Sequence, residues 1–392
     1  MYRILRITDA YPPPWSGLGP GPYALSNAQA ALGNEIHVIA KYTEGCEDTD
    51  RNALPRVHRI KARSYLFEAL AIRKALELDL LHDFHLIHTH GSSFFLFHLL
   101  YGRKFKKPVV ATIHSLRKKQ FELYAKEGIK KISMNEKLSL WKEKITINNC
   151  GFFFPVSNGL KDELIEGYRI PDKNIVIPGN GAEPFFLNKP EPEEINRLKL
   201  KYALDSCQTL LFVGALNGRK DVPQIIFALK DLKQRDIQAK LVIIGSGPMK
   251  TRYEELAASS GVREETCFIH NVPQKELSVF YQLADIFAFP SFYEGLPKVV
   301  IEAMAAGLPI VCSDIPGNNQ LVTHGIHGLL SAIEDREAFR NNIIQLLESP
   351  DLRARMGAAG KKKIEDEYTW RAVADRYQKA YSSLLDKNGP DR

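Results

Sequence analysis

Two glutamates eight residues apart, Glu294 and Glu302, are the side chains whose type and spacing point most directly to chemistry. The apolar run Ile286–Phe289 predicts a strand, and the stretch from Pro297 to Gly307 predicts a short helix, because Pro is tolerated in a first turn and Gly ends helices. Glu294 then stands at the helix mouth and Glu302 in the second turn, at most about 12 Å apart along the axis. Carboxylates accept hydrogen bonds from vicinal hydroxyls, and the free N–H groups of a helix start attract phosphate. The pattern therefore suits the sugar, diphosphate and ribose of a nucleotide sugar.

Spacing alone also fits an ordinary pair of helix glutamates, one capping and one solvated. The whole stretch from Pro290 to Gly307, however, resembles the Glu-x7-Glu signature of the retaining group 1 (GT4-like) glycosyltransferases, which have the GT-B fold. In that family the first Glu holds hexose hydroxyls and the second holds the ribose, so the resemblance implies these roles for Glu294 and Glu302. It also implies donor binding for the four residues after Glu294, which are Gly295, Leu296, Pro297 and Lys298.

A basic turn after the apolar run Thr209–Val213 is a second candidate contact with the donor. Arg219 and Lys220 stand side by side there and can neutralise a diphosphate, the Arg as a fork and the Lys as a point charge. The turn resembles the family's Gly-Arg-Leu-x-x-x-Lys-Gly loop with two departures, since Ala215 replaces the first Arg and Asp221 replaces the last Gly. An ordinary basic turn is the alternative.

Glycine-rich turns follow two other predicted strands. Gly17 and Gly19 let backbone N–H groups approach a sugar or an anion closely, and a purely structural turn explains them equally well. Gly245 and Gly247 follow the predicted strand Lys240–Ile244 but lack the third glycine of the dinucleotide fingerprint. We therefore expect a tight turn near the donor at these two glycines, and we exclude a Rossmann dehydrogenase.

Three histidines, His88, His90 and His114, stand at the ends of the predicted strands His85–His88 and Val109–Ile113. The resemblance implies a catalytic role for His114, because a matching Thr-x-His segment of the family contacts the transferred sugar near the reacting carbon. The His-x-His element before it is usually structural or lines the acceptor side. A histidine at a strand end is more often a satisfied structural residue, which is the alternative.

Length and composition describe an ordinary globular chain of two domains. Its 392 residues exceed the usual limit of one core, with 44% hydrophobic and 25% charged residues. No apolar run approaches the ~18 residues of a membrane span, and the N-terminus resembles a strand more than a signal peptide, so a cytoplasmic location is expected. The 5 cysteines are odd in number and lack zinc or thioredoxin spacing, which predicts buried free thiols in a reducing compartment.

Short apolar strands alternate with helical stretches through both halves, which predicts an α/β fold of two doubly wound, Rossmann-like domains. The last predicted strand of the first half is Ile175–Ile177, and the Pro- and Glu-rich segment Glu183–Glu194 predicts a connection. We expect an acceptor-side domain over residues 1–185 and a donor-binding domain over residues 200–370. The resemblance implies a central cleft between them and a C-terminal helix, within 371–392, that crosses back to the first domain.

Two further predictions concern metals and large partners. The single Asp-x-Asp triplet, Asp48–Asp50, lies in a polar loop, so we expect no metal and no other cofactor, with the diphosphate neutralised by protein groups. Residues 103–144 carry 13 Lys or Arg against 4 Glu, with apolar residues between them, which suits an anionic membrane surface as well as a plain solvated face. Nucleic acid is not expected, because the donor residues already account for a nucleotide.

These features predict a retaining, metal-independent glycosyltransferase that moves a hexosyl group from a nucleotide-diphosphate sugar to the hydroxyl of a sugar or lipid-linked acceptor. The resemblance implies a setting in surface polysaccharide or glycolipid synthesis, at the inner face of the membrane if the basic segment binds lipid. Two alternatives stay open. One is a nucleotide-sugar epimerase, which would consume the donor with no acceptor present. The other is a non-catalytic sugar-nucleotide-binding paralogue, which Ala215 and Asp221 keep open.

Overall fold

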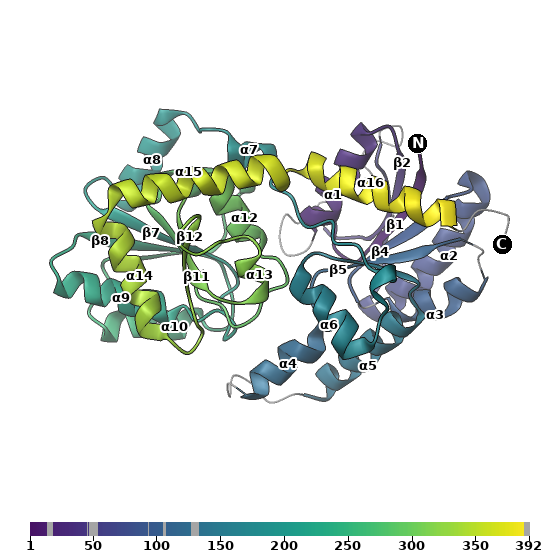
Figure 1. Ribbon diagram of the computed structural model, residues 1–392, viewed down its shortest axis with the longest axis horizontal. Coiled ribbons are helices and arrows are strands. Elements are labelled where there is room, and N and C mark those ends of the chain that lie inside the picture. The colour runs from purple at the N-terminus through teal and green to yellow at the C-terminus, as the bar shows by residue number, and fades with distance from the viewer. Residues whose placement is uncertain are drawn as a thin grey trace. The chain divides into compact units, whose positions relative to one another are not determined.

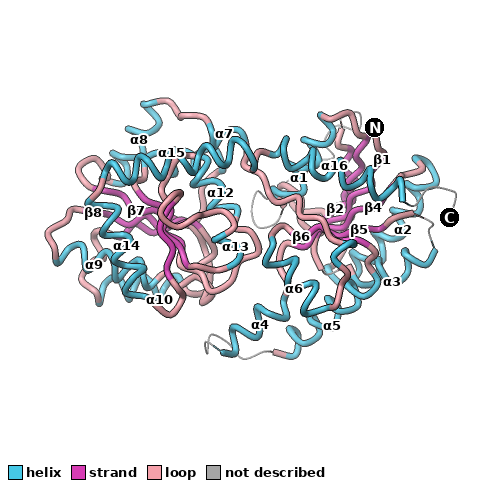
Figure 2. Tube along the Cα trace, viewed as in Figure 1, coloured by secondary structure: helices cyan, strands magenta, loops and turns pink. Residues whose placement is uncertain are grey.

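The computed structural model describes residues 1–13, 19–44, 46, 54–92, 94–104, 107–126 and 133–387. The chain divides into two compact units, which we call the first unit (Met1–Asn180 and Trp370–Arg392) and the second unit (Gly181–Thr369). Each unit contains a six-stranded parallel sheet with helices on both faces (Figure 1 and Figure 2). The predicted α/β class with two doubly wound halves is confirmed.

The first sheet has the strand order β3-β2-β1-β4-β5-β6, so the order reverses between β1 and β4. Every residue of β4 and β5 is buried, as expected of central strands covered on both faces. Strand β3, a half-buried edge strand with two arginines and a histidine, was not predicted. The strand predicted at Ile175–Ile177 was wrong, because in this segment Ile175 alone forms a single bridge to β6. The strands are β1 (Arg3–Thr8), β2 (Glu35–Lys41), β3 (Arg56–Ile60), β4 (Leu86–His90), β5 (Val109–Ile113) and β6 (Phe152–Pro155).

The helices of the first unit bury two apolar clusters against the two faces of this sheet. One cluster includes Leu25 of α1 together with Tyr377 and Tyr381 of α16, so a helix that follows the second unit in sequence completes the core of the first. The other lies under α2, through Ala71 and Leu78. The helices are α1 (Pro20–Ala31), α2 (Ser64–His82), α3 (Phe95–Lys104), α4 (Arg117–Lys126), α5 (Met134–Asn149), α6 (Asn158–Tyr168), the 3₁₀ helix η1 (Asp172–Asn174) and α16 (Trp370–Lys387).

The second sheet has the strand order β12-β11-β10-β7-β8-β9, which reverses between β7 and β10. Open parallel sheets bind ligands at such a switch point, beyond the carboxyl ends of the strands. The strands predicted at Thr209–Val213, Lys240–Ile244 and Ile286–Phe289 are confirmed to within one residue at either end. The six strands of the sheet are compact apolar runs. They are β7 (Gln208–Val213), β8 (Ala239–Ile244), β9 (Thr266–Ile269), β10 (Ile286–Phe289), β11 (Ile310–Ser313) and β12 (Gly328–Ser331).

Helices surround this sheet and extend into the segment that was expected to be a bare connection. Within Glu183–Glu194 the chain forms α7 and begins α8, and Phe186 of α7 is fully buried against Tyr281. That segment is therefore part of the second unit's packing. The helices are α7 (Pro184–Leu187), α8 (Pro192–Tyr202), α9 (Pro223–Gln234), α10 (Lys250–Ser259), α11 (Gln274–Leu283), α12 (Lys298–Ala305), α13 (Pro316–Asn319), α14 (Arg336–Glu348) and α15 (Pro350–Glu367).

The cysteines and the helix lengths bear on the expectations of buried free thiols and of no membrane span. All five cysteines are free thiols, and three of them, Cys46, Cys150 and Cys312, are buried. Over the described residues, no helix combines the length and the apolar character that crossing a membrane would need.

Candidate active site

Two loops at the switch point of the second sheet are tied together by their backbones. The loop after β7 and the loop after β10 meet in an antiparallel bridge between Lys220 and Ser291. Beside it the Phe292 N–H donates to the Arg219 carbonyl at 3.0 Å, and the Tyr253 hydroxyl donates to the Lys220 carbonyl at 3.2 Å. The bridge brings the two predicted donor contacts, the basic turn and the first glutamate, into one site.

Glu294 lies at the centre of this site and is surrounded by donors. Its Oε1 forms an ion pair with Lys220 Nζ and accepts a hydrogen bond from Ser291 Oγ at 2.6 Å, and Arg219 Nε lies 3.8 Å away. The side chains of Lys220 and Glu294 are only 5% and 9% exposed. Lys220 also lies over the ring of Phe289, 4.0 Å from its centroid. The pair is thus largely withdrawn from water.

Burial and charge oppose each other in this pair. Burial alone would raise the pKa of Glu294, but the charges of Lys220 and Arg219 outweigh burial and lower it. Burial lowers the pKa of Lys220 to about 8, against the attraction of Glu294. Both partners are therefore charged at neutral pH, and the cation is close to its titration point.

Glu302 lies in a different environment in the second turn of α12. It accepts a hydrogen bond from the Tyr281 hydroxyl of α11 at 3.0 Å, and burial raises its pKa. The helix begins at Lys298, one residue later than expected, because Pro297 is the extended residue before it. The two glutamates therefore occupy the predicted places, one before the helix and one in its second turn. Glu294 forms an ion pair with Lys220, whereas Glu302 accepts a hydrogen bond from Tyr281.

The residues between the two glutamates form a tightly packed helix start. Gly295, Leu296 and Pro297 are buried, and Lys298 is half-buried. The backbone of Glu294 and Gly295 also touches Gly317 at the start of α13. A Cβ atom on Gly317 would lie 2.6 Å from the Glu294 carbonyl oxygen, so any other residue would displace the loop that carries the carboxylate.

The Gly245-Ser246-Gly247 turn packs against the loop after β7. A Cβ atom on Gly245 would lie 1.9 Å from the carbonyl oxygen of Gly214, and one on Gly247 would lie 2.3 Å from that of Leu216. These glycines are needed for the close approach of two backbones. The turn thus packs directly against the backbone of the basic loop.

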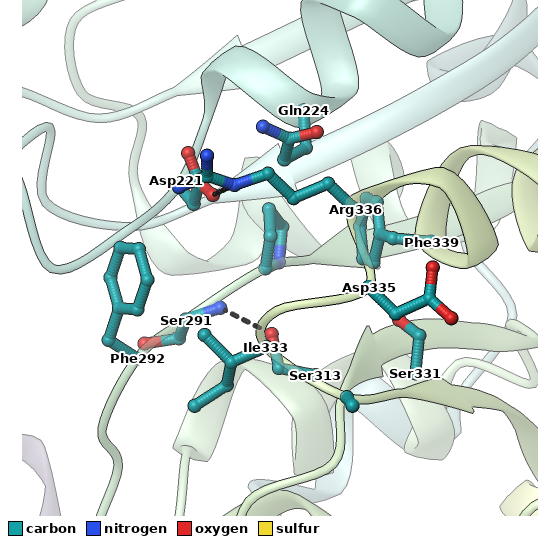
Figure 3. Close-up of a pocket in the computed structure, with 12 residues that line it drawn as sticks. Asp221, Gln224, Ser291, Phe292, Ser313, Ser331, Ile333, Asp335, Arg336 and Phe339 are labelled. Carbon is teal, nitrogen blue, oxygen red and sulfur yellow. Dashed lines mark hydrogen bonds and ion pairs between the residues drawn. The ribbon is translucent and has the colours of Figure 1, made fainter. Parts of the chain in front are cut away.

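Asp221, the departure from the family loop, has a charge partner of its own. Arg336 of α14 extends towards it, with Nε 3.3 Å from the carboxylate, at the edge of a small pocket that Gln224 also lines (Figure 3). The pocket volume is ≈ 10 Å³, about the room of one water molecule. The negative charge of Asp221 is therefore balanced by a residue outside the basic turn.

The three predicted histidines, His88, His90 and His114, form a chain near the carboxyl ends of β4 and β5. His88 is fully buried and bonded on both ring nitrogens, to the Tyr381 hydroxyl at 2.6 Å and to Thr112 Oγ1 at 2.7 Å. His90 stacks on it and contacts His114, with 3.3 Å between their ring nitrogens. Burial lowers the pKa of both His88 and His90 well below the usual value.

These contacts separate the three histidines. His88 is a structural residue that ties α16 to the sheet. His114, the predicted catalytic residue, is half-buried at the end of β5 and is held by His90. It belongs to the first unit, whereas Glu294 belongs to the second.

The glycines after β1 are only partly described. Gly19 immediately precedes α1, and a Cβ atom there would lie 3.3 Å from the backbone nitrogen of Tyr11, so the turn is closely packed. Gly17 and the Asp48–Asp50 triplet lie outside the described residues.

A larger hollow, of ≈ 570 Å³, lies in the first unit at the opposite ends of the strands. Val109 and Phe152, at the amino ends of β5 and β6, line it together with Ala380 and Leu384 of α16. Among the predicted site residues that the structure describes, none lines this hollow, so size alone does not locate the candidate active site.

Comparison with known families accounts for both units. Residues 196–363 match the family model of glycosyl transferases group 1, and residues 15–184 match that of glycosyltransferase family 4. The chain belongs to the group 1 glycosyltransferases. Its membership agrees with the resemblance inferred from the residues around Glu294.

Individual proteins are similar to this glycosyltransferase over about half of its chain or over nearly all of it. An uncharacterized glycosyltransferase of Methanocaldococcus jannaschii is 27% identical over 99% of this chain and 100% of the relative. A GDP-mannose-dependent phosphatidylinositol monomannoside mannosyltransferase of Mycolicibacterium smegmatis is 30% identical over 51% of this chain and 53% of the relative. The solved sucrose-phosphate synthase of Thermosynechococcus elongatus has a TM-score of 0.82 at 22% identity, covering 99% and 100% of the two chains. The fold of this glycosyltransferase is GT-B.

One positioning residue of the glycosyltransferase lies inside its basic segment and was missed. Glu143 of α5 is fully buried and accepts hydrogen bonds from the Arg117 N–H at 3.0 Å, Ser92 Oγ at 2.9 Å and the Tyr168 hydroxyl at 2.6 Å. It therefore anchors the turn that directly follows His114. Its only sequence signal was an acidic residue among lysines, which more often marks a solvated salt bridge.

Proposed function

We propose that this glycosyltransferase is a retaining, metal-independent enzyme that moves a hexosyl group from a nucleotide-diphosphate sugar to an acceptor hydroxyl. The observation that carries the proposal is the buried pair of Lys220 and Glu294 at the switch point of the second sheet. A cation there suits a diphosphate, and a carboxylate beside it suits sugar hydroxyls.

The basic turn would balance the charge of the leaving diphosphate. An ammonium group has three donors, so Lys220 can keep its contact with Glu294 and still donate to a phosphate oxygen. Arg219 adds a fixed, planar set of donors beside it. Preorganised cations in a water-poor site stabilise developing negative charge, which is the task a metal would otherwise perform.

The two glutamates would bind opposite ends of the donor. Glu294, held by Ser291 and Lys220, presents a charged carboxylate to the sugar hydroxyls. Glu302 would accept hydrogen bonds from the ribose, with Tyr281 fixing the orientation of its carboxyl group.

Retention of the anomeric configuration requires the acceptor to attack on the face that the diphosphate leaves. In this proposal the departing diphosphate takes the proton of the acceptor hydroxyl. His114, which contacts His90, would contact the transferred sugar near its reacting carbon.

We also propose that the acceptor is presented at an anionic membrane surface. On α5 the apolar side chains of Met134, Leu138 and Trp141 are 77%, 50% and 53% exposed at helical spacing, with Lys137 and Lys144 exposed beside them. Such a helix face binds anionic lipid through apolar insertion and charge. The name of the mannosyltransferase relative specifies a lipid-linked acceptor, which supports this assignment.

The decisive experiment measures donor binding and donor turnover separately. Thermal shift against UDP, GDP, ADP, dTDP and CMP, each with and without Mg²⁺, should give one nucleotide that raises the melting temperature without metal. NMR of the product made from the matching sugar nucleotide should show the donor's own anomeric configuration. An inverted product, or turnover that needs Mg²⁺, would contradict the proposal.

The same experiment separates the two alternatives. Conversion of the donor to another sugar nucleotide in the absence of acceptor would identify an epimerase. Tight donor binding with no conversion by any acceptor would identify a non-catalytic binding protein.

The membrane contact needs its own test with a matched control. Sedimentation with vesicles containing anionic lipid should be weakened by the double substitution Leu138→Ser and Trp141→Ser. Leu80 of α2, which is 89% exposed, provides the control substitution Leu80→Ser. Equal vesicle binding by all three proteins would contradict a contact through α5.

A further inference from the structure

A group of ligand-type side chains converges at the amino end of β2, on the face of the first sheet that α2 covers. Glu35 and His37 lie two residues apart on β2 and therefore point to the same face. His82 is the last residue of α2, and His58 lies on the neighbouring edge strand β3. No step of the proposed reaction uses these residues.

The distances within the group suit a small tetrahedral metal site. One ligand atom each from Glu35, His37 and His82 lies within 4.8 Å of the other two. His37 Nε2 is 3.2 Å, and His82 Nδ1 is 3.7 Å, from Glu35 Oε1. Metal–ligand bonds of 2.0–2.1 Å in a tetrahedron place neighbouring ligand atoms about 3.3 Å apart, so small side-chain shifts complete the geometry.

We infer that Glu35, His37 and His82 form a site for a divalent transition metal of the zinc class, with His58 orienting His37. Two imidazoles and one carboxylate are a ligand set that Zn²⁺ accepts, with the fourth position left for water. The site would fasten the end of α2 to strand β2.

The surroundings of the three ligands supply the further contacts that metal sites require. His37 Nδ1 is 3.2 Å from His58 Nε2, so its N–H can be directed to His58 while Nε2 faces the metal. Phe84 packs against the rings of His37 and His82. His37 is 1% exposed, whereas Glu35 and His82 are 21% and 26% exposed, which gives the ion a route of entry from solvent.

One neighbouring cation opposes metal binding and provides a sharp test. Arg56 Nη1 is 3.5 Å from Glu35 Oε1, and its side chain is 38% exposed. A bound dication would repel this guanidinium, which can turn into solvent. We therefore expect Arg56→Gln to strengthen metal binding and His82→Gln to weaken it.

The test uses the full chain, stripped with a chelator and titrated with Zn²⁺ in competition with a chromophoric chelator. We expect one Zn²⁺ per chain, at least ~10-fold weaker binding in His82→Gln, a similar loss in His58→Gln and tighter binding in Arg56→Gln. Co²⁺ should give the visible absorption of a tetrahedral N/O site. His324→Gln, at an exposed histidine of the second unit, is the control and should bind as the wild type does.

Stability supplies a readout that does not depend on activity. Zn²⁺ should raise the melting temperature of the wild type and of His324→Gln, and should leave that of His82→Gln unchanged. His82 is partly exposed at a helix end, so its variant should melt as the stripped wild type does without metal. Equal Zn²⁺ affinity in wild type and His82→Gln, or no measurable binding by the wild type, would overturn the inference.

Discussion

The carboxyl ends of the two sheets use different chemistry on the same kind of scaffold. Both sheets reverse their strand order between two central strands, and both present polar side chains there. In the first sheet these are three histidines in contact with one another: His90 stacks on His88 and its ring nitrogen contacts His114. In the second they are the ion pair of Lys220 and Glu294.

The difference shows how a fold divides its tasks. Burial lowers the pKa of His88 and His90, so the first sheet presents neutral polar groups near its end. The second sheet keeps two opposite charges out of water, which is stable only because each charge has the other and further donors. The ion pair suits a diphosphate donor, and the buried rings of His88 and His90 suit hydrogen bonds to uncharged groups.

The largest expected effect follows from removing the carboxylate. Glu294→Gln should lower kcat roughly 10²–10³-fold, because its contact with the sugar would tighten in the transition state. Steady-state kinetics with saturating donor measures this effect. An unchanged kcat would remove Glu294 from the reaction and break the contrast between the sheets.

Removing the cation should affect stability as well as donor binding. Lys220→Met removes the ion-pair partner of the buried Glu294 and leaves it the contacts with Arg219 and Ser291, so the free energy of unfolding should fall by about 3 kcal/mol. Denaturant unfolding measures the change. The double variant Lys220→Met/Glu294→Gln should recover part of the loss, and a purely additive result would contradict coupling between the two charges.

His114 should contribute less than either charged residue. His114→Asn should lower kcat by roughly 10- to 10²-fold, the value of one or two hydrogen bonds in the transition state, with little change in donor affinity. His90→Gln provides a comparison, since it removes the ring that His114 contacts. A fall in donor affinity that exceeds the fall in kcat would assign His114 to binding.

The smallest effect is a pH dependence that belongs to the second unit alone. The pKa of Lys220 is about 8, and in the proposed function its protonated form holds the diphosphate. Affinity for a sugar nucleotide should therefore weaken above pH 8, by at most ~10-fold per pH unit. Calorimetry with a sugar nucleotide is the suitable measurement, because its phosphates stay ionised. Lys220→Arg should remove the dependence. A wild-type affinity that is constant to pH 9.5 would show that Lys220 does not hold the donor.

Much of the fold follows from local patterns in the sequence. Strands β7, β8 and β10 were predicted because each is a compact apolar run, and the helix after Glu294 because Pro and Gly bracket it. Strand β3 was missed because an edge strand such as Arg56–Ile60 has no fully buried residue and lacks that signal.

The candidate site was predictable only in part, because several of its contacts join residues far apart in sequence. Spacing and resemblance singled out Glu294 and Lys220 but not their ion pair, which depends on the backbone bridge between two loops. Tyr281 and Glu143 carry no local signal, since a tyrosine in an amphipathic helix and a glutamate in a basic run are ordinary. His82 could not be linked to β2 from the sequence either, because the two are far apart in the chain and come into contact only in the folded first unit.

Helix α16 has a consequence for the order of events during synthesis. Its Tyr377 and Tyr381 fill the core of the first unit and bond to Thr112 and His88, yet they leave the ribosome after the whole second unit. The sheet of the first unit is synthesised before α16, so one of its apolar faces stays exposed to water until α16 has been made. The second unit can complete its core before that point. We therefore expect the second unit to complete its folding before the first. The apolar face that α16 later covers is a natural binding site for chaperones.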